Sequence, residues 1–394
     1  MVRNINLFPW FKFAQSLIFW QATWFLYFER NLSAAEAIFL YVIYDIATTV
    51  LEVPSGYMSD RLGRRLTLIA AALSGLAAIL ILVFGEGFSQ FMLANVLLGA
   101  SAAFASGTDS SLLYESLSAE GRAAEIEQAE LKAWRFGFTA LALSAVMGGA
   151  LALFDDAFPW IATALAGVVL LGITLFFREP PHGKSVSYRE SFNALRRSFV
   201  HPTLIWLLGL TLLMYVFSHL PFVFGQPFIR ESLAAMGYAE QTPLVSGAVT
   251  GLMMVISVGF SHLAMPLRNR FGLGGILLLA FGLQIGLTVA LATSNNWFVI
   301  ALLFFRMVPD SLSRPFIQAR IQPLLQDGTR ATYLSVQSLA GRLLFAITLS
   351  IAAGQTSGDA AMPYSDMQLI LAVYAGIGLL FWLVLVRTAK RAKI

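Results

Sequence analysis

The residues best suited to charge chemistry form a cluster at the end of a long apolar run. The stretch EVPSGYMSDRLGRR, residues 52–65, places an acid before a proline and then combines an aspartate with three arginines. Asp60 follows a predicted helix end, where a carboxylate can accept hydrogen bonds from the first amides of a neighbouring helix, whose dipole favours an anion. The arginines can pair with acids on adjacent helix ends or with anionic lipid head groups; they are Arg61, Arg64 and Arg65.

Two glycines in this stretch indicate that the charges hold helices together. Gly56 and Gly63 permit a tight turn and a close approach between helices. The alternative is that the arginines only mark the cytoplasmic side of a membrane protein. That alternative explains the arginines but not an aspartate and glycines at fixed spacing, so we predict that the stretch is a gate latch.

Ionisable groups also occur inside the apolar runs, where they are costly and therefore point to function. Asp45 lies about nine residues into a predicted span, roughly 13 Å from its outer end at 1.5 Å per residue, and shares a helix face with Glu52. We predict that Asp45 couples transport to protons; the alternative is a static ion pair, for instance with Lys12. For Glu52, nearer the inner end, we prefer structural pairing, with proton coupling as the second interpretation.

A second set of intramembrane charges lies in the predicted span 297–317. Arg306, Asp310 and Arg314 follow one another at intervals of four residues and therefore share a helix face. Asp310 is a further candidate for proton coupling. Arg306 either pairs with Asp310 or binds an anionic substrate through its planar guanidinium. Asp109, near the inner end of the predicted span 89–114, is predicted to be a gate residue.

Polar and aromatic side chains within the spans are candidates for lining a substrate cavity, because a cavity that binds solutes needs both kinds. In the predicted spans 7–28, 89–114, 203–224 and 297–317, these candidates are Gln15, Phe19, Thr23, Asn95, Tyr215 and Arg306.

Composition places the chain in a membrane. Of its 394 residues, 58% are hydrophobic and only 12% are charged, and apolar stretches long enough to cross a bilayer as helices recur throughout. The net charge of +4 resides in short connectors, which reflects membrane topology and gives no reason to expect nucleic acid binding. There is no cysteine and the four histidines are scattered, so we expect no disulfide, metal site or cofactor.

The pattern predicts about 12 transmembrane helices, and the distribution of basic residues predicts their orientation. If the N-terminus is cytoplasmic, that side holds most of the lysines and arginines, while the other side holds only Arg30 and Arg230. Both termini are therefore predicted to be cytoplasmic. The longest charged connector, residues 179–202, separates six spans in residues 1–178 from six in residues 203–394. Part of it, residues 187–199, is predicted to form an amphipathic helix on the membrane surface, with a solvated linker as the alternative.

The two halves carry weak internal repeats. SDRLGRR at residues 59–65 is echoed by RNRFGLG at residues 268–274, and the Asp109-Ser110 pair is echoed by Asp310-Ser311. These pairs occupy equivalent places in the two halves. We therefore expect two six-helix repeats related by an axis normal to the membrane, an arrangement found in transporters.

The sequence GYMSDRLGRR resembles the signature between the second and third helices of the major facilitator superfamily, and the prefix EVPSG resembles bacterial members of the multidrug-exporter type. The resemblance implies an all-α polytopic membrane fold with 12 transmembrane helices in two pseudo-symmetric six-helix bundles. It also implies a bacterial cytoplasmic membrane location, and that the latch around Asp60 closes the cytoplasmic side in the outward-facing state.

These observations predict a secondary active transporter that moves a small organic solute by alternating access, with proton-coupled export favoured. Proton-coupled uptake of a metabolite is the main alternative. A membrane-embedded lipid-modifying enzyme is less favoured, because there is no GxSxG or HExxH motif and the loops are short. The expected partners are a small-molecule substrate, protons and membrane lipids, and the chain is expected to act as a monomer without enzymatic activity.

Overall fold

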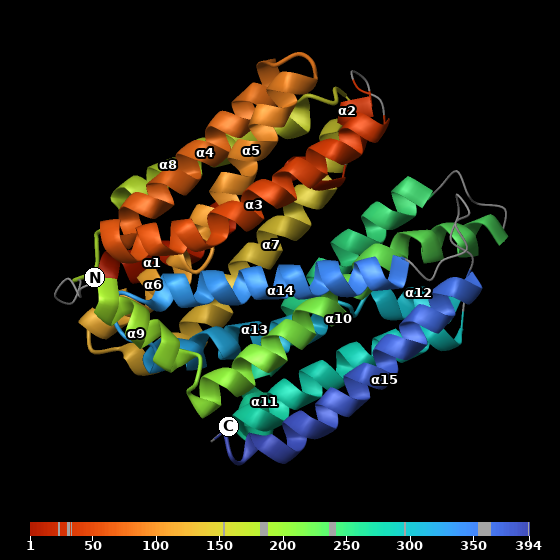
Figure 1. Ribbon diagram of the computed structural model, residues 1–394. Coiled ribbons are helices and arrows are strands. Elements are labelled where there is room, and N and C mark those ends of the chain that lie inside the picture. The colour runs from red at the N-terminus through yellow and green to blue at the C-terminus, as the bar shows by residue number, and fades with distance from the viewer. Residues whose placement is uncertain are drawn as a thin grey trace. The chain divides into compact units, whose positions relative to one another are not determined.

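The computed structural model describes residues 1–22, 24–29, 32, 34–152, 154–181, 188–235, 242–294, 297–353, 364–392 and 394. All regular elements within these residues are helices (Figure 1). By their contacts the residues form two compact units, of which the first comprises Met1–Phe199 and Gln318–Leu339, and the second Val200–Ile317 and Ala340–Ile394. The division into bundles at residues 178 and 203 remains a prediction.

The helices alternate with short connectors along the whole chain. From the N-terminus to the predicted linker they are α1 (Val2–Gln15), η1 (Phe19–Ala22), α2 (Trp24–Glu29), α3 (Ala34–Leu62), α4 (Arg64–Phe84), α5 (Phe88–Ala105), α6 (Thr108–Ala119), η2 (Ala123–Glu125), α7 (Ile126–Ala152), α8 (Phe158–Phe176) and α9 (Tyr188–Ser198). The remainder are α10 (Pro202–Ala235), α11 (Thr242–Thr293), α12 (Trp297–Leu303), α13 (Val308–Ile321), η4 (Gln322–Leu324), α14 (Arg330–Ala353) and α15 (Tyr364–Ala389).

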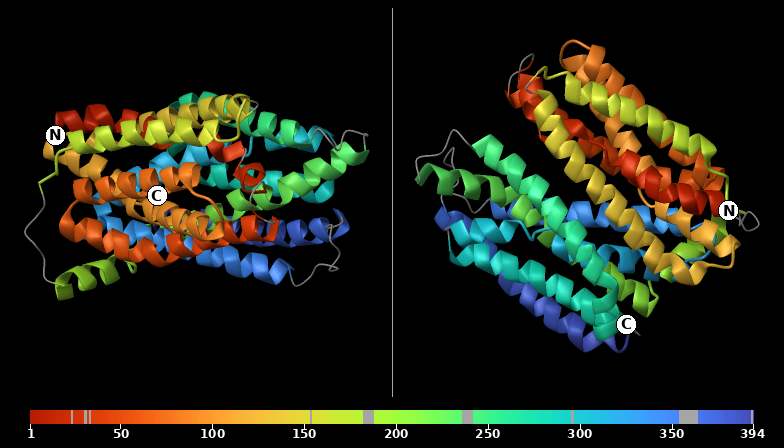
Figure 2. Two further views of the ribbon diagram at one scale, coloured as in Figure 1. Left: turned by 90° about the horizontal axis from the view of Figure 1, so that it is seen from above. Right: turned by 180° about the vertical axis from the view of Figure 1, so that it is seen from behind.

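Small residues bring the helices of the first unit close together. α4 packs against α5 and α8, α3 packs against α5, and α1 lies along α7, as the two views of Figure 2 also show. A Cβ atom at Gly99 of α5 would lie 2.7 Å from the carbonyl oxygen of Tyr44 in α3. Only glycine permits this approach, which is tied by a hydrogen bond of 2.7 Å from Ser55 Oγ to the Ala103 carbonyl oxygen.

In the second unit, α15 lies along α11 and also contacts α10. Aromatic side chains fill the space between these helices: the ring of Phe217 in α10 packs edge-on against Phe281 in α11. Two tryptophans of this unit donate their indole N–H to carbonyl oxygens of a neighbouring helix, Trp206 to Leu385 at 3.1 Å and Trp382 to Leu278 at 2.9 Å. These bonds satisfy the one polar atom of each indole in an apolar environment.

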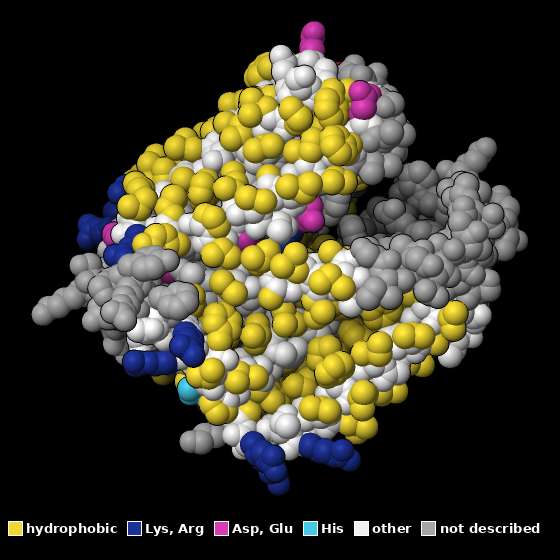
Figure 3. All heavy atoms as spheres, viewed as in Figure 1, with side chains coloured by type: hydrophobic (Ala, Val, Ile, Leu, Met, Phe, Trp, Pro, Cys, Tyr) yellow, Lys and Arg dark blue, Asp and Glu magenta, His cyan; other side chains and the backbone are white. Residues whose placement is uncertain are grey.

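Within the described residues, seven helical segments are long and apolar enough to cross a membrane: 64–84, 88–119, 123–152, 158–176, 202–220, 251–293 and 367–389. Hydrophobic side chains cover the flanks of the helices, while Lys and Arg side chains gather at their ends (Figure 3). Exposed leucines, valines and phenylalanines on the flanks suit a lipid environment. The predicted all-α, multi-pass membrane fold is confirmed.

Several predicted spans are interrupted. The span 7–28 ends its first helix at Gln15 and continues as η1 and α2. The span 89–114 breaks between α5 and α6 at Gly107, whose φ of 70° lies in the left-handed region. The span 297–317 breaks at residues 304–307, between α12 and α13. The spans 243–266 and 273–293 are both parts of α11 and meet at the non-helical Gly272.

Candidate functional site

The carboxylate of Asp60, near the end of α3, caps the first turn of α14. Its Oδ2 accepts hydrogen bonds from the Thr332 amide at 2.9 Å and the Thr332 hydroxyl at 2.6 Å. Its Oδ1 accepts a hydrogen bond from the Ala331 amide at 3.2 Å. The carboxylate therefore satisfies amides that a helix start leaves without intrahelical partners, and it places a negative charge where the helix dipole favours one. This is the cap geometry expected from the sequence.

The guanidinium of Arg64 joins this carboxylate to a second acid. The Arg64 side chain is fully buried and its Nη1 binds both Asp60 Oδ1 and, at 3.0 Å, Ser59 Oγ. Its other edge makes two hydrogen bonds with Glu115 of α6, at 2.8 Å from Nη2 and 3.2 Å from Nε. A buried arginine with two carboxylate partners is stable only as a set, and removing one partner from such an ion pair costs about 3–5 kcal/mol.

Glu115 also lies against a second arginine. Arg330, the first residue of α14, approaches Glu115 Oε1 to 3.4 Å and pairs with Asp327 just before the helix. Its guanidinium stands over the Tyr114 ring, 4.9 Å from the ring centre. Together, Asp60, Arg64, Glu115 and Arg330 form a charge network that links α3, α6 and α14. We call these four residues the latch network.

Glu179, which the sequence analysis did not single out, caps α4 where the latch motif turns. Its carboxylate accepts hydrogen bonds from the Arg64 amide at 2.7 Å and the Arg65 amide at 2.8 Å. Gly63 makes the turn with a φ of 107°, and a Cβ atom there would lie 2.8 Å from the Glu179 carboxyl carbon. Arg65 extends to the C-terminal end of α8, where Nη2 donates to the Leu175 carbonyl oxygen at 3.0 Å. A lone acid in a connector carries no local signal of this contact.

Glycines allow α14 to lie directly on α3 and α6. A Cβ atom at Gly56 would lie 2.5 Å from Ser335 Oγ and 2.9 Å from the Ala331 carbonyl oxygen. A Cβ atom at Gly107 would lie 2.7 Å from Leu334 Cβ. Both glycines therefore permit the contact that carries the Asp60 cap.

Arg61 does not join the latch network. Its side chain lies on its own helix, where Nε donates to the Tyr57 hydroxyl at 3.2 Å and the guanidinium stands 5.5 Å from the Tyr57 ring centre. Of the two kinds of partner predicted for the motif arginines, lipid head groups remain the prediction for Arg61, because it lies on the exposed side of α3.

A second charge cluster joins α1, α6 and α7. Lys12 Nζ lies 2.7 Å from Asp109 Oδ2 and 2.8 Å from Gln15 Oε1. Asp109 Oδ1 accepts a hydrogen bond of 2.7 Å from the Ser110 amide at the start of α6. In the sequence, Lys12 is a candidate ion-pair partner of Asp45. The structure pairs Lys12 with Asp109 at the start of α6.

Glu130 of α7 completes this cluster, and sequence analysis missed it. Its side chain is 8% exposed, makes a hydrogen bond with Ser110, and lies within electrostatic reach of Asp109 and Lys12. Its Oε1 atom is buried without a hydrogen-bond partner among the described residues. Lys12, Asp109 and Glu130, which we call the acid cluster, thus combine one cation with two carboxyl groups. Glu130 lies in the helical segment 123–152, which is long and apolar enough to cross a membrane. An acid in such a segment points to a functional site, since ionisable groups are rare at membrane depth.

Asp45 and Glu52 lie on α3 in different environments. Glu52 is fully buried, whereas Asp45 is partly exposed. Neither is among the residues of the acid cluster.

The third predicted acid, Asp310, is buried in the second unit. Its Oδ2 accepts a hydrogen bond of 2.7 Å from Ser218 Oγ in α10, and its Oδ1 accepts one of 3.2 Å from Arg314 Nε. Arg306 lies in the turn before α13, within electrostatic reach of Asp310. The three charges at intervals of four therefore do not lie on one continuous helix, because the helix is interrupted between Leu303 and Val308.

The residues predicted to line a substrate cavity lie in different surroundings. Gln15 accepts a hydrogen bond from Lys12. Phe19 is only 8% exposed, and its amide donates to Thr163 Oγ1 at 3.1 Å. Asn95 is buried and donates to the Phe91 carbonyl oxygen of its own helix at 2.8 Å. The ring of Tyr215 stacks on His219 at 4.1 Å. Thr23 lies outside the described residues. Within the described chain, no group of three or more His, Cys, Asp or Glu is arranged to hold a metal ion.

Comparison with known proteins identifies the class. The family model described as Major Facilitator Superfamily matches residues 11–349, so the chain belongs to this superfamily of membrane transporters and is not an enzyme. The comparison with curated protein sequences found no match.

Solved structures of the same fold cover nearly the whole chain. The crystal structure of the human organic anion transporter MFSD10 (TETRAN) has a TM-score of 0.75 at 14% identity, covering 97% of this chain and 99% of that one. A bacterial homologue of the iron transporter ferroportin, in an outward-facing state, has a TM-score of 0.74 at 17% identity, covering 99% of both chains. The nucleoside transporter NupG has a TM-score of 0.65 at 14% identity, covering 98% and 99%. At these identities the likeness concerns the fold.

Proposed function

We propose that this secondary transporter exports a small organic solute in exchange for protons by alternating access. The observation that carries the proposal is the acid cluster, in which the buried Glu130 carboxyl lies beside the Lys12–Asp109 ion pair. Ionising Glu130 gives the cluster a net charge of −1, and protonating it gives a neutral cluster. Because buried net charge is costly, the occupancy of this proton changes which arrangement of the surrounding helices is favoured.

Helix α6 connects the acid cluster to the latch network. Asp109 and Ser110 in its first turn face the acid cluster, while Glu115 on the same helix binds Arg64 and Arg330. A movement of α6 that follows proton uptake would change the geometry of Glu115 against both arginines. We propose that the latch network closes the cytoplasmic side, and that Asp45, Glu52 and Asp310 are the other candidates for proton transfer.

The nature of the substrate and the direction of its transport are proposed from separate observations. The cations Arg306 and Arg314 around the buried Asp310 support an organic solute with an anionic group, and one fold relative is described as an organic anion transporter. Export rests on the EVPSG prefix. Uptake by symport uses the same acids and is the alternative. The basic connectors support a cytoplasmic location of both termini. The bacterial inner membrane is proposed from the resemblance of residues 52–65, and we propose that the monomer is the functional unit.

The test is proton-linked flux in proteoliposomes loaded with a pH-sensitive dye. A panel of organic anions and neutral metabolites is added with and without an imposed pH gradient. We expect a solute on the panel to move only when protons move in the opposite direction. Solute flux that is indifferent to the gradient would exclude proton coupling, and co-directional movement would replace export by uptake.

A matched pair of variants tests the acid cluster. Glu130→Gln keeps the shape of the side chain and removes its proton exchange, whereas Glu86→Gln makes the same change at an exposed acid. We expect Glu130→Gln to abolish gradient-driven accumulation while solute counterflow persists, and Glu86→Gln to behave as wild type. Normal gradient-driven accumulation by Glu130→Gln would remove this carboxyl from the mechanism.

A further inference from the structure

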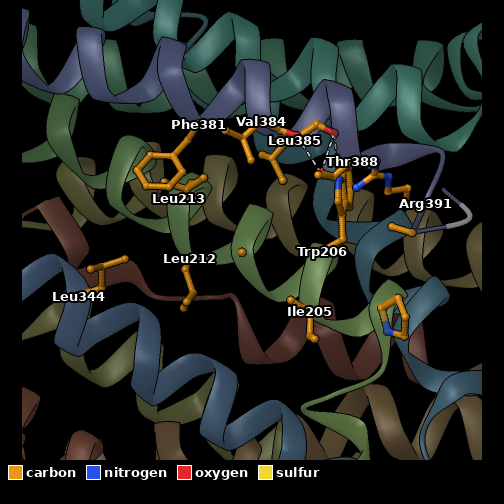
Figure 4. A pocket seen from close by; sticks show the side chains of 13 residues that line it. Ile205, Trp206, Leu212, Leu213, Leu344, Phe381, Val384, Leu385, Thr388 and Arg391 are labelled. Atoms are coloured by element: carbon orange, nitrogen blue, oxygen red, sulfur yellow. Dashed lines mark hydrogen bonds between the residues drawn. The ribbon is translucent and has the colours of Figure 1, made fainter.

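A groove in the second unit lies outside both charge clusters. It runs between α10, α14 and α15 and has a volume of about 520 Å³. Its walls are apolar and include Ile205, Leu212, Leu213, Leu344 and Phe381 (Figure 4). Ile205 and Phe381 are exposed, so the groove opens to the flank of the helices, where the surroundings of a membrane protein are lipid.

The floor of the groove is held by interhelical hydrogen bonds. Trp206 is 5% exposed and donates its indole N–H to the Leu385 carbonyl oxygen at 3.1 Å. Thr203 Oγ1 donates to the Ala392 carbonyl oxygen at 2.8 Å, which joins the start of α10 to the turn after α15. A Cβ atom at Gly209 would meet no atom within 4 Å, so there is open space beside this residue. The groove therefore has a floor fixed by hydrogen bonds and free volume next to Gly209.

The groove is basic at one end only. Thr388 and Arg391 line that end, whereas Leu344 and Phe381 lie toward the other (Figure 4). Arg387 and Lys390 lie in the same two turns of the chain. An occupant that complements the groove therefore has an anionic end and a hydrocarbon tail.

The length of the groove matches one leaflet of a bilayer. Along α10, Ile205 and Leu213 are eight residues apart, which is about 12 Å at 1.5 Å per residue. Half of a typical hydrocarbon core is about 15 Å. A tail that begins at Arg391 would therefore lie at the depth of one leaflet.

We propose that this groove is a binding site for an anionic phospholipid, whose phosphate lies against Arg391 and one of whose acyl chains lies along Trp206, Gly209 and Leu213. The site is independent of the substrate and of the acid cluster. It differs from the general lipid contact of a membrane protein in two ways. The site prefers an anionic head group, and it holds one acyl chain in a defined groove.

The experiment measures lipid binding to the full chain in detergent by native mass spectrometry. Phosphatidylglycerol is compared with phosphatidylcholine of the same acyl chains. Two variants alter the site: Arg391→Gln removes the cation, and Gly209→Phe fills the groove. Two controls repeat these changes elsewhere in the second unit, Arg270→Gln at another basic helix end and Gly286→Phe at a glycine whose Cβ also meets no atom.

We expect Arg391→Gln to weaken phosphatidylglycerol binding about tenfold and leave phosphatidylcholine binding unchanged. Gly209→Phe should weaken the binding of both lipids, and the controls should remain within twofold of wild type. Circular dichroism checks that each variant is folded.

A second readout uses phosphatidylglycerol with brominated chains, which quench nearby tryptophans. The quenching should be smaller by the contribution of one indole in Trp206→Phe. Equal effects of Arg391→Gln and Arg270→Gln, or equal effects of the two glycine variants, would leave only nonspecific lipid contact and overturn the proposal. Displacement of the lipid by inorganic phosphate alone would show that Arg391 binds a free anion, and would also overturn it.

Discussion

Replacing Asp60 by Asn isolates the contribution of the latch network. The change keeps the size of the side chain but removes its charge and turns one acceptor oxygen into a donor NH₂. That donor would face the Ala331 or Thr332 amide, both of which are donors, or the Arg64 guanidinium. At least one buried donor is then left without an acceptor, and Arg64 retains Glu115 as its carboxylate partner.

The expected magnitude follows from these contacts. Losing a helix cap costs about 0.5–2 kcal/mol, and breaking a buried ion pair costs about 3–5 kcal/mol. Since the two effects share one carboxylate, they are not additive. We therefore expect Asp60→Asn to destabilise the state with the cap formed by about 3–5 kcal/mol, relative to a state in which α3 and α14 separate. A difference of 1.4 kcal/mol is a factor of 10 in population, so the shift is on the order of a hundredfold or more.

The assay is a spin-label distance between the two helix ends. Because the chain contains no cysteine, labels attach only at introduced positions, and Leu62 and Gln326 are both exposed near the cap. We expect a single short distance in the parent chain and a longer, broader distribution in Asp60→Asn. Arg61→Gln serves as the control, because Arg61 lies on Tyr57 outside the network.

Two outcomes for Asp60→Asn would contradict this prediction. If Asp60→Asn lowers thermal stability but leaves the distance distribution and the transport rate unchanged, the network is a static part of the fold and the gate proposal fails. If it changes neither stability nor distance, the cap itself contributes nothing.

Three further predictions concern other contacts. Gly63→Ala should destabilise the fold more than Gly121→Ala in thermal unfolding. Both glycines have positive φ, which costs a non-glycine residue about 1–2 kcal/mol, but only the Cβ at Gly63 would meet the Glu179 carboxylate. The hydrogen bond from the N-terminal ammonium lowers the pKa of Glu120 below its usual value. This contact therefore stabilises the folded state above the ordinary carboxyl pKa and is lost as pH falls through the lowered one. Acetylating Met1 should raise the pKa of Glu120 toward its usual value in an NMR titration, while the Val2 amide and Arg122 continue to lower it. Arg306→Lys should abolish transport of an organic anion while the protein still folds, if its guanidinium binds the substrate; unchanged transport kinetics would assign Arg306 to pairing within the protein.

Sequence patterns predict the parts of the site that depend on local chemistry. The Asp60 cap follows from an acid at a helix end, and the close approach at Gly56 follows from a glycine at fixed spacing in the same stretch. The partners of these residues were not predictable in the same way. Thr332 is 272 residues from Asp60, and Glu115 is 51 residues from Arg64. Which acid faces a given arginine depends on how the helices pack, and an isolated glutamate in an apolar helix has the same local pattern wherever it points.

By itself, the sequence determined that this chain is an all-helical membrane transporter with a charged stretch at residues 52–65, because hydropathy and helix-end chemistry act over a few neighbouring residues. Only the tertiary structure decided that Lys12 pairs with Asp109, that Glu130 joins them, and that Arg61 is left out of the latch network. Asp109 and Glu115 lie on the same helix, α6, but their spacing makes them point in different directions around it. Which cluster each acid meets is set by the packing of helices from distant parts of the chain, which no local pattern encodes.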